Sequence, residues 1–115
     1  MIKKESFMYD EDLDKIMIFN ELDEGDEIYG STKIFNLVLD FTKTNKIANV
    51  EIRNVSEYLE SLGMSSGILD DLESTEILLD HLDGGFLLTV LLRSNGVVYR
   101  VPFSIATEKE ILVSS

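Results

Sequence analysis

The chain has 115 residues, no cysteine and a formal net charge of −12, from 22 acids against ten lysines and arginines. With 44% hydrophobic residues it can build the core of a single domain, and the lack of cysteine excludes disulfides, thiolate metal sites and cysteine nucleophiles. The negative charge repels phosphate backbones and anionic lipid, so the composition disfavours binding to nucleic acid or membranes.

The first residues, Met1 to Phe7, lack the apolar stretch of a signal peptide. The longest apolar run, Phe86 to Leu92, contains Thr89 and is far shorter than the ~20 residues that cross a bilayer. We therefore expect a soluble, cytoplasmic protein.

Alternating aspartates give the strongest chemical signal in the chain: Asp10, Asp12 and Asp14. Together with Glu21 they are spaced similarly to the ligands of a calcium-binding loop. Such a loop needs glycine for its sharp bend at the position where this chain has Lys15, the first residue of a strand over 15–20. The pattern predicts a hairpin over 9–19, in which Asp10 and Asp14 accept hydrogen bonds from nearby backbone amides. Weak calcium binding is the alternative.

The stretch 21–27 is predicted to be a solvated loop around Gly25 that burial does not order. Residues 34–41 form the next predicted strand. In the strand after it, Ala48, Val50 and Ile52 alternate with polar residues, which is typical of a strand with one buried face. Residues 42–45 make the turn between these two strands, with Asn45 suited to a left-handed conformation.

The middle of the chain has the only helical patterns. Asn54 and Glu57 are spaced like a capping box, and Gly63 is suited to end the short helix that follows. The apolar stripe of this helix consists of Tyr58, Leu59 and Leu62. Ser65 or Ser66 is expected to cap a second short turn, and the apolar residues of that turn are Ile68, Leu69 and Leu72.

The last third of the chain predicts a meander of three strands. Helix spacing also fits 75–82, but the Asp83-Gly84-Gly85 turn that follows favours a strand. The strand over 86–92 is apolar on both faces, and Ser94-Asn95-Gly96 joins it by a hairpin to a strand over 97–105. Pro102 cannot donate a backbone hydrogen bond, so we expect it at a sheet edge or a bulge.

These elements predict a single domain, 1–115, of the α+β class and dominated by strands. We expect about seven antiparallel strands in two meanders, with one or two short helices between them. Several strands are apolar on both faces, which a short helical cover cannot bury. Either two sheets pack together or a second subunit covers the remaining face.

His81 is the only histidine and lies near Asp80 and Asp83, so it is a candidate general base or metal ligand. In a strand, however, Asp80 and His81 point to opposite faces, and any further metal ligands would have to be carboxylates. We therefore expect His81 to be a half-exposed structural residue. No nucleophile elbow or glycine-rich phosphate loop occurs in the sequence.

Short motifs in the first half of the chain match a known family: Tyr9-Asp10, Asp14 with the aliphatic strand that follows, Val38-Leu39-Asp40, Val50-Glu51-Ile52 and Asn54-Val55. Over about residues 7–55 the chain resembles the small prokaryotic proteins grouped as domain of unknown function 2283. Asn45 stands where that family usually has a turn glycine. The resemblance implies a β-rich fold and a hairpin over 9–19, and it implies no reaction.

We expect a non-catalytic domain that needs no cofactor or metal and acts through protein–protein contact as a homodimer. Most of the interface is expected from residues 75–105, through Leu87, Leu91 and Val98. One alternative is an acidic regulator that binds and neutralises a basic protein through 10–14 and 21–27. The other is a small cation-dependent hydrolase that uses the acids and His81.

Overall fold

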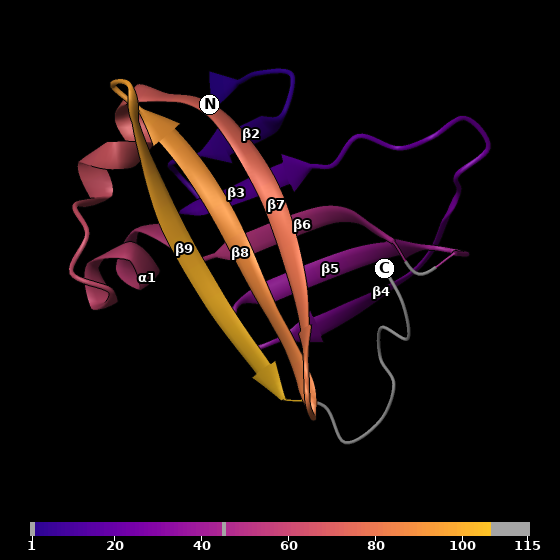
Figure 1. Ribbon diagram of the computed structural model, residues 1–115. Coiled ribbons are helices and arrows are strands. Elements are labelled where there is room, and N and C mark those ends of the chain that lie inside the picture. The colour runs from indigo at the N-terminus through magenta and orange to yellow at the C-terminus, as the bar shows by residue number, and fades with distance from the viewer. Residues whose placement is uncertain (1, 45, 107–115) are drawn as a thin grey trace.

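The structure is a computed structural model that describes residues 2–44 and 46–106 (Figure 1). Its elements are β1 (Ile2–Lys3), β2 (Phe7–Asp10), β3 (Lys15–Phe19), β4 (Ile28–Ile34), β5 (Leu37–Thr42), β6 (Ile47–Arg53), α1 (Val55–Ser61), the 3-10 helix η1 (Ser66–Asp71), β7 (Leu72–Leu82), β8 (Gly85–Ser94) and β9 (Val97–Ala106). The expected strand-dominated α+β fold, with two short helices between two groups of antiparallel strands, is confirmed. Only the second group is a simple meander, because β3 pairs with β6 in the first. None of the described helices has the length and apolar character needed to cross a membrane.

The strands form two antiparallel sheets, which we name sheet A and sheet B. Sheet A has the order β1-β2-β3-β6-β5-β4, and sheet B has the order β7-β8-β9. In Figure 1 the strands of sheet B cross those of sheet A, and α1 lies beside β9 at one side of the two layers. Of the two arrangements left open by the sequence, packing of two sheets is present within one chain.

The strand expected over 34–41 is wrong at its beginning, because the chain turns at Phe35 and Asn36 between β4 and β5. Phe35 has a φ of 54°, which no strand accommodates. The side chain of Asn36 donates to the carbonyl oxygen of Arg53 at 3.0 Å, and the Arg53 amide donates back to the Asn36 carbonyl at 2.7 Å. The turn is thus held by β6, which the local sequence pattern does not reveal.

In sheet B the strand predicted for 75–82 is confirmed, and it begins earlier, at Leu72, which therefore does not belong to the second helical turn. The Asn95-Gly96 hairpin is also confirmed, with φ values of 51° and 75°. Pro102 lies on β9, an edge strand, as expected. The hydroxyl of Tyr58 on α1 donates to the Pro102 carbonyl oxygen, and the Tyr58 ring stacks on Phe103 with 4.5 Å between ring centroids.

One hydrophobic core lies between the inner faces of the two sheets. Alternate residues of β8 are at most 3% exposed and belong to this core: Phe86, Leu88, Val90 and Leu92. They pack with the inner residues of sheet A and with Val55, Leu59 and Leu69 from the two helices. Because successive side chains of a strand point to opposite faces, Leu87 and Leu91 point away from this core.

Candidate interaction surface

The acidic stretch at 10–14 forms the turn of the β2–β3 hairpin, so the hairpin prediction for 9–19 is confirmed. The carboxylate of Asp10 accepts hydrogen bonds from the amides of Asp12 at 3.1 Å and Leu13 at 3.3 Å. This is the expected local use of Asp10. No group of three or more histidine, aspartate or glutamate side chains that could hold a metal ion occurs within residues 2–44 and 46–106.

Asp14 does not bind a nearby amide as expected; its partner is Ser56, at the start of α1. Its two carboxylate oxygens accept from the Ser56 amide at 3.0 Å and the Ser56 hydroxyl at 2.7 Å, and its carbonyl oxygen accepts from the Val55 amide at 3.1 Å. The predicted capping box at Asn54 is wrong, because Asn54 has a φ of 53° and makes no capping hydrogen bond with its side chain. The hairpin turn therefore supplies the cap of the helix.

His81 and Asp80 lie on β7 and alternate between the two faces of sheet B, as the strand prediction implied. His81 pairs with Phe86 of β8, whereas Asp80 pairs with Leu87, which points away from the core. Asp83 lies in the turn before β8. Asp80 and His81 therefore do not share a face of sheet B.

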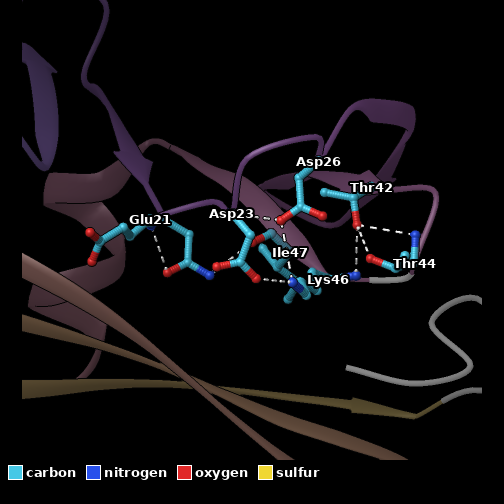
Figure 2. Close-up of polar contacts among 8 residues, drawn as sticks. Glu21, Asp23, Asp26, Thr42, Thr44, Lys46 and Ile47 are labelled. Atoms are coloured by element: carbon cyan, nitrogen blue, oxygen red, sulfur yellow. Dashed lines mark hydrogen bonds and ion pairs between the residues drawn. The ribbon is translucent and has the colours of Figure 1, made fainter.

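The loop over 21–27 is ordered by charge, which the sequence did not reveal (Figure 2). The ammonium of Lys46 contacts Asp23 at 2.7 Å and Asp26 at 3.3 Å, and Asp26 in turn accepts from the Asp23 amide. Thr42 closes the neighbouring turn by accepting from the amides of Thr44 and Lys46. The left-handed conformation predicted for Asn45 lies outside the described residues.

The hydrogen bond and charge of Lys46 lower the pKa of Asp23, and the hydrogen bonds to Asp23 and Asp26 raise the pKa of Lys46. Because the pKa of Asp23 is lowered, the contact stabilises the loop at every pH above the ordinary aspartate pKa. This stabilisation is lost as the pH falls through the lowered value.

We expect Lys46→Met to raise the Asp23 pKa toward its ordinary value, measured by NMR titration of the side-chain carboxyl. Lys43→Met is the matched control, since Lys43 lies in the same turn but pairs with Glu27 at 2.9 Å. An equal rise in both variants would contradict the specific contact.

A hollow of about 710 Å³ lies where the β1–β2 connection meets β7. Its lining includes Lys4, Glu5, Glu21 and Glu73. The hydroxyl groups of Ser6 and Thr75, which also line it, bind each other at 3.2 Å and the backbone at 3.0 and 3.1 Å. These hydrogen bonds join the two sheets.

No described part of the chain covers the outer face of sheet B (Figure 1), and several of the residues on that face are apolar. Its apolar residues are Leu78 and Leu82 on β7, Leu87 and Leu91 on β8, and Val98 and Pro102 on β9. Leu82 and Val98 are 52% and 45% exposed, and Leu78, Leu87 and Leu91 are half-buried. The three residues predicted for the interface, Leu87, Leu91 and Val98, therefore share one face.

Four charged side chains also lie on this outer face: Glu76, Asp80, Arg93 and Arg100. The first two belong to β7, and the arginines belong to β8 and β9. A hollow of about 320 Å³ near one end of the face is lined by Leu91, Glu76, Arg93 and Val98, among others. The sequence reasoning missed this charge pattern, because it appears only when the strand registers are known.

The chain matches no family model, no curated protein and no solved structure in the comparisons made with them. The resemblance to domain of unknown function 2283 over residues 7–55 stays a prediction.

Proposed function

We propose that the protein is a non-catalytic interaction domain of the cytoplasm that works as a homodimer through the outer face of sheet B. The observation that supports this most directly is the row of leucines on that face, with Leu87 and Leu91 at its centre. Clusters of apolar side chains with polar residues around them are typical of interaction sites on soluble proteins. A closed two-fold dimer buries the same patch of both copies and leaves no sticky surface.

The size of the face sets the expected strength of the dimer. Three strands about 4.8 Å apart and about ten residues long, at roughly 3.4 Å per residue, give a flat area of about 500 Å² per copy. Specific interfaces of standard size bury about 800 Å² per partner. Association must also offset the loss of rotational and translational freedom. We therefore expect dissociation in the micromolar range.

The test is a pair of charge-introducing substitutions on the face. Leu87→Asp and Leu91→Asp should each convert a dimer of twice 13.0 kDa to a monomer, measured by light scattering or sedimentation at tens of micromolar. Burying an unpaired carboxylate at the centre of an apolar contact is strongly unfavourable. Leu13→Asp is the matched control, since Leu13 is 63% exposed in the β2–β3 turn. A wild-type mass of 13.0 kDa at these concentrations would refute the dimer.

The alternative of an acidic regulator has less support from the geometry. Asp10 and Asp14 are engaged with backbone amides, and Asp23 and Asp26 are engaged with Lys46. These four acids therefore have partners within the chain, although Asp10 and Asp14 keep their negative charge. Salt-sensitive capture of a basic protein by the wild-type chain would favour this alternative.

A further inference from the structure

The outer face of sheet B differs in net charge from the rest of the protein. The whole chain carries −12, yet this face has two acids and two arginines and is therefore neutral. Two of the three arginines of the chain lie here, and residues 47–106 contain no lysine. Interfaces favour arginine and are depleted in lysine. Self-association through this face therefore brings no excess of acids together at the contact, although each copy still carries −12.

The strand registers place opposite charges at the two edges of the face. Glu76 of β7 pairs with Leu91 of β8, and Leu91 pairs with Arg100 of β9. Laterally paired residues of a sheet share a face, so these three form one row with the leucine in the middle. Glu76 and Arg100 are exposed, and the ion pairs found among the described residues involve neither of them.

A face-to-face dimer has two simple choices of two-fold axis. A two-fold axis parallel to β8 places β7 of one copy over β9 of the other. Each residue keeps its position along the strand direction, so Glu76 of one copy faces Arg100 of the other. A two-fold axis perpendicular to the strands places β7 of one copy over β7 of the other, with the two strands running in opposite directions. Glu76 of one copy then faces Asp80 of the other. The first choice joins Glu76 and Arg100 twice and brings Arg93 near its own copy once, whereas the second brings Glu76 and Asp80 together twice and joins no opposite charges.

We propose that the two copies are related by a two-fold axis along β8, so that Glu76 of each copy pairs with Arg100 of the other. This inference rests on the homodimer proposed above. The packed faces of two sheets are about 10 Å apart, a gap that a glutamate and an arginine can span together. The hollow between Glu76 and Arg93 gives the arriving Arg100 side chain room. The same axis brings the Arg93 side chains of the two copies near each other. They lie at the exposed end of the face, where water screens their repulsion.

The experiment is a charge swap read by native mass spectrometry and sedimentation, with one variant isotopically labelled. Glu76→Arg and Arg100→Glu should each weaken self-association at least about ten-fold, since each replaces two attractive pairs by two repulsive ones. Mixed together, the two variants should form a heterodimer, because both cross-pairs then join opposite charges. The double variant should recover the wild-type homodimer.

Controls and opposite outcomes separate this inference from the dimer itself. Glu60→Arg on α1 and Lys33→Glu on β4 make the same changes of net charge at exposed positions away from the face, and they should leave the dimer unchanged. A tighter dimer for Glu76→Arg would instead indicate the axis across the strands. Unchanged dissociation constants for both single variants would overturn the proposed pairing but leave the dimer standing. A monomeric wild type would overturn both proposals.

Discussion

Replacing Gly85 with alanine should lower the free energy of unfolding by about 3 kcal/mol, near the upper end of overpacking effects. A Cβ atom at Gly85 would overlap the carbonyl oxygen of Ile105 and lie 3.0 Å from the Cα of Ala106. These are backbone atoms of β9, which cannot rotate away as a side chain would. The strand itself must move, and the hydrogen-bonded pairing of Gly85 with Ala106 is lost.

The neighbouring glycine provides the matched control for this prediction. A Cβ at Gly84 would meet no atom within 4 Å, but Gly84 has a φ of 78°. Gly84→Ala should therefore cost only the backbone strain of a left-handed residue, about 1 kcal/mol. Urea denaturation of the two variants measures the difference. An equal or larger loss for Gly84→Ala would contradict the close approach of β9 to Gly85.

Removing the Asp14 side chain should destabilise the protein by about 2–3 kcal/mol as Asp14→Ala, through loss of a charged cap and strain at positive φ. The carboxylate receives both the Ser56 amide and the Ser56 hydroxyl, and Asp14 itself has a φ of 49°. Asp14→Gly removes the cap without the strain and should cost about 1–2 kcal/mol. Asp14→Asn keeps an acceptor and tolerates the backbone, so it should cost the least.

Urea denaturation of the three variants gives this order directly. Asp12→Ala in the same turn is the control, because Asp12 is exposed and should change stability by no more than about 0.5 kcal/mol. Equal losses for Asp14→Gly and Asp12→Ala would show that the cap contributes nothing.

The strands of sheet B and the β2–β3 hairpin are predictable from the sequence because their signals are local, whereas the prediction missed β4 (Ile28–Ile34) and its hairpin with β5. Alternation of apolar residues along 97–105 and the Asn95-Gly96 pair depend on neighbours one or two positions away. The same alternation predicts that Leu87 and Leu91 lie on one face. Only the choice between a strand and a helix for 75–82 needed the turn that follows it.

The features that the sequence did not reveal depend on residues far apart in the chain. Asp14 and Ser56 are 42 residues apart, and Lys46 and Asp23 are 23 apart. No periodicity encodes such pairs. Phe35 carries no turn signal either, since a bulky aromatic residue rarely adopts positive φ. The row of Glu76, Leu91 and Arg100 likewise requires the registers of two strand pairs at once.

The contact between Tyr58 and Pro102 has a consequence for aggregation. β9 is an edge strand, and an open edge is a template on which another chain can add a strand. Pro102 offers no donor there, and the Tyr58 hydroxyl occupies its carbonyl oxygen. The short helix α1 thus hinders the addition of a strand from another molecule at this edge. Because Asp14 caps the first turn of that helix, the same carboxylate supports the contact that covers this edge of β9.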